Sequence, residues 1–167
     1  MQLRPLELQD APLMLEWMHD ASVVSHMGTN FMEKTLADCE NFIRWAQTAE
    51  QDLHLAVVDQ TDEYLGTVSL KHIEKDAAEF AITIRACAMG KGVSRFAMET
   101  ILRKGLFEMG LEKIYWCVSP ENQRAVRFYN KNQYPRVAVQ TLQPMGYSQE
   151  QLDYFIWYAV TKADITR

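Results

Sequence analysis

The chain of 167 residues has few of the residues that interrupt or cross-link a fold. Its 7 glycines and 5 prolines leave no stretch with the composition of a linker. The 3 cysteines (Cys39, Cys87 and Cys117) are widely spaced and form no C-x-x-C motif, which argues against a disulfide framework or a zinc knuckle. The 4 histidines have no H-x-x-x-H spacing, so we expect no metal site. The length predicts one domain, residues 1–167, that is stabilised by hydrophobic burial alone.

Long apolar runs and an excess of basic charge are also missing. No stretch approaches 18 apolar residues, and residues 1–6 do not have the pattern of a charged and then apolar leader. We therefore expect a cytoplasmic protein with no membrane partner. The 17 basic and 22 acidic side chains give a net charge of −5, which argues against a nucleic-acid partner and favours a cationic or neutral substrate.

Apolar periodicity predicts strands that alternate with helices. We expect strands at 3–6, 53–58, 64–72, 79–84, 113–118, about 136–142 and 153–160, and helices beginning near 10 and 35 and spanning 94–109 and 122–132. Residues 21–34 have no clear period and are expected to be irregular. The order indicates an α/β (α+β) fold, with a mixed central sheet of about six to seven strands flanked by about four helices.

Connections and caps refine this picture. Short polar turns predict that the three strands between 53 and 84 form an antiparallel meander. A helix between strands 79–84 and 113–118 predicts that these two strands are parallel. Asp10 before Pro12 is typical of a helix start, as is Thr35 followed by Asp38.

Two glycines stand where a strand turns into a helix. Gly90 and Gly92 lie in the segment Met89–Ser94, between the β-like run 79–84 and the helical pattern that follows. Glycine is used where the backbone needs a positive φ, or where a ligand approaches the main chain without meeting a Cβ. Backbone N–H groups at a helix N-terminus are a ready seat for a phosphate or a pyrophosphate. Most Gly-x-Gly turns nevertheless bind nothing.

A second pattern begins the later helix. Asn122 is a good N-cap after the turn residues Ser119 and Pro120, and Tyr129 follows seven residues on. Ala125, which lies one helical turn before Tyr129, is on the same face of the helix. Tyr129 can equally be a core aromatic residue whose hydroxyl reaches water.

Taken together, these segments resemble the GNAT acetyltransferase superfamily. The resemblance rests on four segments in order: 79–84, 89–94, 111–115 and 120–129. It is closest to the branch of ribosomal-protein N-terminal, spermidine and amino-sugar acetyltransferases, which are bacterial-type enzymes, and residues 3–7 also look like the first strand of that branch. Two positions depart from the family pattern: Cys87 stands where Gln or Arg is frequent, and Gln133–Tyr134 stands where Gly-Phe is frequent.

The resemblance implies a GNAT fold and acetyl-CoA as the acyl donor. The backbone of Ile82, Thr83 and Ile84 would hold the pantetheine arm and polarise the thioester carbonyl. Asn122 would hydrogen-bond the arm, and Tyr129 would face the sulfur. Main-chain amides would hold the pyrophosphate, and they come from Met89, Gly90, Lys91, Gly92, Val93, Ser94 and Arg95.

The chemistry makes these roles reasonable. An alkyl amine with a pKa near ~10.4 is neutral in less than about 0.1% of molecules at pH 7, and only the neutral form attacks. A base, directly or through a water chain, must therefore take a proton, and the departing sulfur must gain one. Tyr129 is the candidate general acid. Glu79 is the candidate base, with an exposed strand-end carboxylate as the alternative reading, and His72 is a weaker candidate.

Other readings stay open at this point. Cys87 could carry the acetyl group covalently, although free cysteines are more often small buried apolar residues. We expect the acceptor to be the primary amine of a small molecule, such as a polyamine or an amino sugar, with a protein N-terminus as the alternative. A protein that binds CoA without catalysing a reaction is the alternative from another functional class. Acceptor contacts are expected from the first two helices and from the C-terminal hairpin. A homodimer is among the oligomeric states left open.

Overall fold

The computed structural model describes residues 1–165 and divides the chain into two compact units. Unit 1 comprises residues 1–71 and 81–101, and unit 2 comprises residues 72–80 together with the chain from residue 102 onward. Strands β3 (Tyr64–Glu74) and β4 (Ala77–Ile84) and helix α4 (Val93–Arg103) each contribute residues to both units. We continue to propose that residues 1–167 form a single domain.

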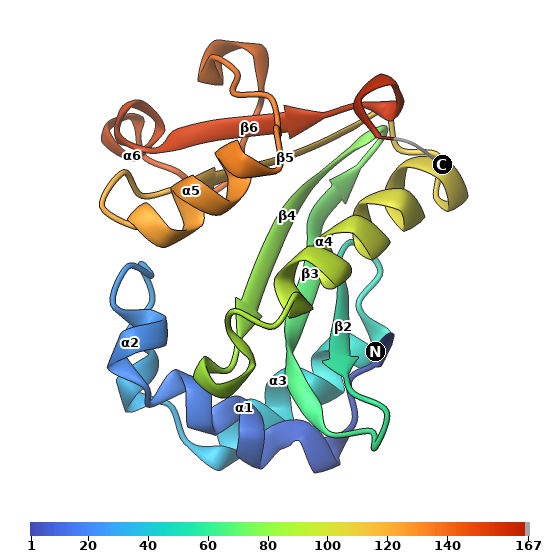
Figure 1. The fold of residues 1–167 in the computed structure, drawn as a ribbon, viewed down its shortest axis with the longest axis vertical. Helices are drawn as coiled ribbons and strands as arrows, with labels where there is room; N and C mark the ends of the chain where they lie inside the picture. Colours follow the sequence, from blue (N-terminus) through green and yellow to red (C-terminus); the bar gives the residue numbers. More distant parts are fainter. Residues whose placement is uncertain (166–167) are drawn as a thin grey trace. The chain divides into compact units, whose positions relative to one another are not determined.

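The strands form one six-stranded mixed sheet of order β1-β2-β3-β4-β5-β6 (Figure 1). The remaining strands are β1 (Gln2–Pro5), β2 (Leu53–Val58), β5 (Lys113–Val118) and β6 (Ile156–Val160). The pairs β1/β2, β2/β3 and β5/β6 are antiparallel, whereas β4 and β5 are parallel. The sheet confirms the predicted fold class and the parallel connection through α4.

Four helices have eight or more residues in the described chain: α1 (Ala11–Met18), α3 (Leu36–Thr48), α4 and α5 (Gln123–Lys131). Two shorter ones are α2 (Ala21–Val24) and α6 (Gln149–Tyr154). Single 3-10 turns occur at Leu8–Asp10, Phe31–Glu33, Ala86–Ala88, Val139–Thr141 and Lys162–Asp164. Between residues 1 and 165, no helix is both long and apolar enough to cross a bilayer.

The core of unit 1 lies between helices α1 and α3 and the strands next to them. Met14, Trp17 and Ile43 are buried there against Val58 and Tyr64. The indole N–H of Trp17 donates to the Tyr64 hydroxyl over 2.9 Å, so the one polar group of this tryptophan is satisfied inside the core. Helix α3 begins with the predicted cap, because Thr35 and Asp38 exchange side-chain to backbone hydrogen bonds.

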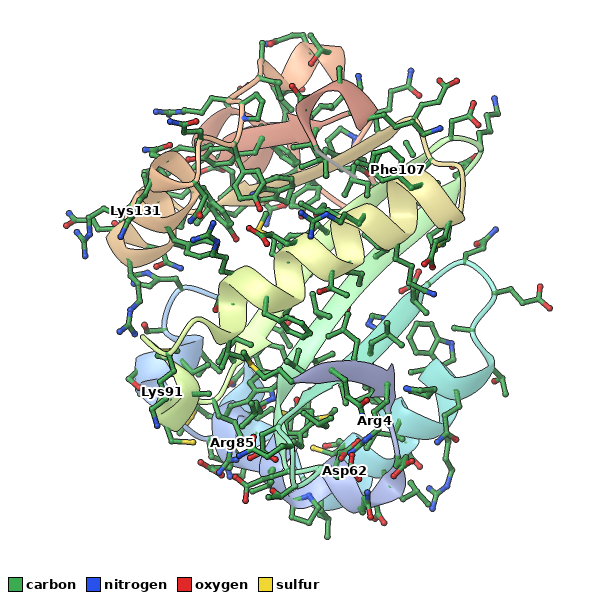
Figure 2. The ribbon with its side chains drawn as sticks, turned by 45° about the vertical axis from the view of Figure 1, so that its right-hand side comes forward. Arg4, Asp62, Arg85, Lys91, Phe107 and Lys131 are labelled. Carbon is green, nitrogen blue, oxygen red and sulfur yellow. The ribbon has the colours of Figure 1, made fainter. Side chains whose placement is uncertain are left out.

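The edge strand β1 carries an ion pair in addition to its pairing with β2. Both guanidinium NH2 groups of Arg4 donate to the buried Asp10 carboxylate at 2.8 Å, and its Nε donates to Asp62 at 2.7 Å (Figure 2). Asp10 also accepts from the backbone N–H of Glu7. The predicted helix start is confirmed, because Asp10 is the N-cap residue of α1, but its carboxylate accepts from Arg4 and from Glu7 N–H and makes no hydrogen bond to the first turn of the helix.

Unit 2 has a different core on each face of β5 and β6. On one face Trp116 stacks on Tyr158 at 5.6 Å and meets the rings of Tyr129, Phe80 and Tyr134. The other face carries Tyr115 and Trp157, covered by residues from 137 to 155. Alternation of side chains along each strand keeps the two cores apart.

Four local predictions need correction. Residues 21–24 form α2, because the Asp20 side chain caps a turn that has no apolar period. The predicted strand at 136–142 is reduced to a single bridge from Arg136 to Tyr158, followed by a 3-10 turn. The predicted strand at 153–160 begins only at Ile156, since a Ser148 capping box starts α6 in the preceding segment. The helix predicted at 94–109 continues after Arg103 as a π-helical segment, Lys104–Glu108, up to Gly110.

We predict that Gly66→Ala destabilises the protein by about 1–3 kcal/mol, as overpacking does in other cores. A Cβ at this position of β3 would lie 2.4 Å from the Thr83 carbonyl oxygen and 2.7 Å from Ile84 Cδ1, and a backbone atom cannot swing aside. Urea unfolding followed by circular dichroism measures the effect. Gly28→Ala is the matched control, because nothing lies within 4 Å of its Cβ position, and it should stay within about 0.5 kcal/mol. Equal midpoints for the two variants would contradict the prediction.

Candidate active site

The glycine turn of unit 1 has the predicted geometry. Gly90 and Gly92 have φ of 76° and 80°, a conformation that residues with a Cβ rarely adopt. Both are exposed, and no heavy atom lies within 4 Å of either Cβ position, so a ligand can approach this backbone directly. The turn ends at Val93, where α4 begins.

The start of α4 offers backbone donors. Phe96 N–H donates to the Gly92 carbonyl at 3.1 Å, the first bond of the helical ladder, and the N–H groups before it have no acceptor inside the helix. These groups belong to Val93, Ser94 and Arg95. Lys91 projects from the turn (Figure 2), and the exposed Arg95 pairs with Glu99 at 3.0 Å. Donors, a helix dipole and two cations together suit an anion such as a diphosphate.

The strand residues before the turn differ in burial. Ile84 is buried, whereas Ile82 and Thr83 are half-buried at the end of β4. Within the same unit, the Thr83 carbonyl lies against Gly66 of β3, which is the tight approach described above. The main chain of 82–84 is thus packed closely on its β3 side.

Asn122 is the N-cap of α5, as predicted. Its Oδ1 accepts from the backbone N–H of Ala125 at 3.3 Å, which fixes the side chain at the helix start. The amide nitrogen of the same side chain carries two donors. A capping asparagine can therefore also donate to a ligand, which a capping aspartate could not.

Tyr129 is 7% exposed in unit 2 and contacts four aromatic rings, those of Trp116, Phe128, Tyr134 and Tyr158. Burial raises the pKa of its phenol. The group therefore keeps its proton at neutral pH and can act as a hydrogen-bond donor or as an acid, but not as a base. The interpretation of Tyr129 as a core aromatic residue describes its packing correctly. That packing is compatible with a role as a hydrogen-bond donor or an acid.

Glu79 is not the exposed strand-end carboxylate that the alternative reading expected. The strand begins two residues earlier, and the residue is 3% exposed. Its Oε2 accepts a hydrogen bond from the Tyr147 hydroxyl. Its Oε1 lies 3.3 Å from Nδ1 of His72, and within residues 1–165 it accepts no hydrogen bond.

Glu79 and Tyr129 lie on opposite faces of the sheet. Glu79 pairs in register with Tyr115 and bonds to Tyr147, which packs on Trp157. Tyr129 packs on Trp116, the next residue along β5, whose side chain points the other way. The parallel pairing of β4 with β5 covers Ala77 to Glu79 and reaches no further toward the end of β4.

Two residues of unit 2 were not among the predicted site residues: Tyr147, which bonds to Glu79, and Trp116, which packs on Tyr129 on the other face. Trp116 is 1% exposed, yet its indole N–H has no hydrogen-bond acceptor in the described part of the chain. No local pattern in the sequence signals either role, because Tyr147 and Glu79 are 68 residues apart.

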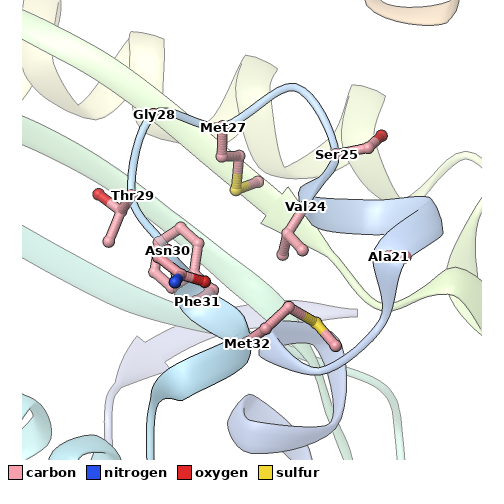
Figure 3. A pocket seen from close by; sticks show the side chains of 9 residues that line it. All are labelled: Ala21, Val24, Ser25, Met27, Gly28, Thr29, Asn30, Phe31 and Met32. Atoms are coloured by element: carbon pink, nitrogen blue, oxygen red, sulfur yellow. The ribbon is translucent and has the colours of Figure 1, made fainter.

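A pocket of about 350 Å³ opens in unit 1 beside α2 (Figure 3). Phe31, Met32 and Val24 supply its apolar lining, and Asn30, Ser25 and Thr29 its polar groups. Asp20 and Glu33 immediately flank the lining segment along the chain. This is part of the segment from which acceptor contacts were expected. Among residues 1–165, no group of three or more His, Cys, Asp or Glu side chains is placed to hold a metal ion.

Comparison with known proteins decides the family. Residues 1–134 match the family model described as an acetyltransferase (GNAT) domain. The chain is a member of the GNAT acetyltransferase family. This accounts for the order of the glycine turn and the asparagine–tyrosine helix.

Relatives and solved structures agree with this family. The chain is 28% identical over 138 residues to a spermidine N(1)-acetyltransferase of Escherichia coli K12, covering 78% of this chain and 70% of that protein. It is 27% identical over 133 residues to an N-acetyltransferase named p20 from Bacillus licheniformis, covering 77% and 75%. The crystal structure of spermidine N-acetyltransferase from Vibrio cholerae in complex with CoA and spermine superposes with a TM-score of 0.79 at 22% identity, covering 97% of this chain and 95% of that one. A GNAT-family acetyltransferase structure from Bacillus anthracis gives a TM-score of 0.75 at 21% identity, covering 96% and 94%.

We predict that Cys87 takes no part in acyl transfer. It is exposed on the turn Ala86–Ala88, whereas Cys39 is buried and burial raises the pKa of its thiol. Cys87→Ser should leave the turnover of acetyl-CoA unchanged within about twofold, and maleimide labelling followed by mass spectrometry should modify Cys87 long before Cys39. A turnover lowered by more than about tenfold would restore the covalent alternative.

Proposed function

We propose that this GNAT-family protein is an acetyl-CoA-dependent N-acetyltransferase that modifies a primary amine of a polyamine. The family match supports acetyl transfer, and the spermidine acetyltransferases among its relatives support the acceptor class. The observation that carries the proposal is that unit 2 buries two groups able to transfer protons, the Glu79 carboxylate and the Tyr129 phenol. A protein that only binds CoA needs neither group.

The residues present fit coenzyme A. The open backbone at Gly90 and Gly92, with the N–H groups that follow to Arg95, suits the diphosphate. The main chain of 82–84 suits the amide-rich pantetheine arm, and the family resemblance implies that the Asn122 amide would donate to the coenzyme. When bound, acetyl-CoA supplies an activated acyl group whose carbonyl carbon is open to attack by an amine.

The protein side chains handle the protons. Glu79 accepts a proton from the incoming amine, directly or through water, because it is the buried carboxylate of this site and its Oε1 has an open acceptor position. Tyr129, kept protonated by burial, donates from its phenol to the sulfur that leaves with the electron pair of the broken C–S bond. Water then returns a proton to Tyr129.

A cationic acceptor fits the charge of the protein. The net charge of −5 attracts polyamines over long distances, and Asp20 and Glu33 stand next to the pocket-lining segment in the sequence. The apolar lining of the pocket in Figure 3 suits the methylene chain between two amines. We propose that this pocket receives part of the acceptor.

We predict that Tyr129→Phe lowers kcat for spermidine acetylation by about tenfold or more, the lower end of what general acids contribute. The ring packing against Trp116 is retained, so acetyl-CoA affinity measured by calorimetry should stay within about twofold. Release of free thiol from acetyl-CoA gives the rate. Equal turnover in the two proteins would remove Tyr129 from the mechanism, and no thiol release by the unmodified protein with any amine would remove the proposed function.

We predict that Asn122→Asp and Asn122→Ala separate the two roles of this cap. Asp keeps the oxygen that accepts from Ala125 N–H, so the free energy of unfolding should hardly change, whereas Ala should lose about 1 kcal/mol. Both lack the amide donor, so both should weaken CoA binding severalfold in calorimetry. If Asn122→Asp bound CoA as tightly as the unmodified protein, Asn122 would be a helix cap and nothing more.

A further inference from the structure

Glu79 is a buried base and therefore cannot exchange its proton with water by itself. At 3% exposure, the carboxylate has to pass on each proton that it accepts before the next turnover. One proton must leave per turnover. The ammonium group of the substrate carries three protons, of which the amide product keeps one and the free thiol keeps one, so the third is released. The neighbours of Glu79 determine where this proton goes.

One oxygen of Glu79 is closed to the proton. The Tyr147 hydroxyl donates to Oε2, and the Cys117 thiol donates in turn to the Tyr147 oxygen at 3.5 Å. Burial raises the pKa of Tyr147, so this phenol remains a donor. The chain of donors is polarised toward the carboxylate and leaves Oε1 as the basic oxygen.

The other oxygen faces an imidazole that reaches the surface. Nδ1 of His72 lies 3.3 Å from Oε1, and the His72 side chain is 35% exposed. His72 also has an unusual backbone for a residue inside a strand, with φ of 51°. A residue with positive φ inside a strand changes the direction of its own and neighbouring side chains, as β-bulges near active sites do.

We propose that His72 is the proton outlet of Glu79 and that Tyr147 is a positioning residue that holds the carboxylate for this transfer. The inference rests on the proposed function. The amine proton is accepted by Oε1 of Glu79, and Oε1 then passes it to Nδ1 of His72. The imidazolium releases a proton to water, and no group is oxidised or reduced. Tyr115, Tyr147 and Cys117 are the other titratable groups next to Glu79, and Glu74 lies near Tyr115.

His72→Gly tests the outlet with little disturbance of the backbone, because glycine adopts a φ of 51° readily. We expect kcat for spermidine to fall about tenfold with the KM for acetyl-CoA unchanged, and free imidazole to restore most of the loss. Lys75→Gly is the matched control, since Lys75 has the same φ of 51° and is exposed in the turn after β3. Its kcat should not change, and imidazole should have no effect on it.

Tyr147→Phe tests the positioning role and keeps the ring contacts with Trp157 and Phe155. We expect kcat to fall severalfold. In the ligand-free protein, the downfield proton resonance of the Tyr147 hydroxyl bonded to the Glu79 carboxylate should disappear in Tyr147→Phe and in Glu79→Gln. Tyr64→Phe, which removes another buried hydroxyl, should retain the resonance and the turnover per folded molecule.

The outcomes separate three failures. If the unmodified protein acetylates spermidine and His72→Gly has the same kcat, the proton outlet is wrong and the proposed function stands. The same holds if His72→Gly loses activity and imidazole does not restore it. A downfield resonance that is absent from the unmodified protein, or unchanged in Tyr147→Phe, overturns the positioning role. Unmodified protein that acetylates no amine overturns the proposed function, and the outlet with it.

Discussion

A carboxylate buried inside a sheet is the constraint on which this active site depends. An ionised side chain loses its hydration when it is buried, and hydrogen bonds from the protein must replace it. Glu79 receives one from Tyr147, which comes from the segment between α5 and α6. That bond does two things at once: it stabilises the carboxylate and it fixes the covering segment over β4 and β5. The other carboxylate oxygen is left without a hydrogen bond inside the described chain, which is what a base requires.

Strand alternation separates the acid from the base. Neighbouring residues of β5 face opposite sides, so Tyr129 packs with Trp116 while Glu79 belongs with Tyr115.

The two faces also differ in their surroundings. Tyr129 is enclosed by rings, which raises the pKa of its phenol and keeps it protonated. Glu79 accepts a hydrogen bond from the Tyr147 hydroxyl, which itself accepts one from the Cys117 thiol, and the His72 imidazole lies 3.3 Å from its other oxygen. The apolar face thus holds the group that donates a proton, and the polar face holds the group that accepts one.

Short-range features could be predicted from the sequence because they depend on a few neighbouring residues. The caps at Thr35 and Asn122, the strand 113–118 and the left-handed glycines at 90 and 92 were all predicted from patterns shorter than ten residues. The family resemblance rests on the same segments. The errors arose where a local pattern was too weak to define an element, as at 21–24, or where a β-like composition pairs with β6 at one residue only, as at 136–142.

The amino-acid order by itself therefore determined the elements, their caps, the glycine turn and the family to which they belong, because backbone conformation and capping are settled by side chains close along the chain. Only the tertiary structure decided that Glu79 is buried, that Tyr147 bonds to it across 68 positions, and that Tyr129 lies on the other face. The physical reason is that burial and hydrogen-bond partners are properties of the packed sheet, in which strand register brings together residues that no local pattern connects.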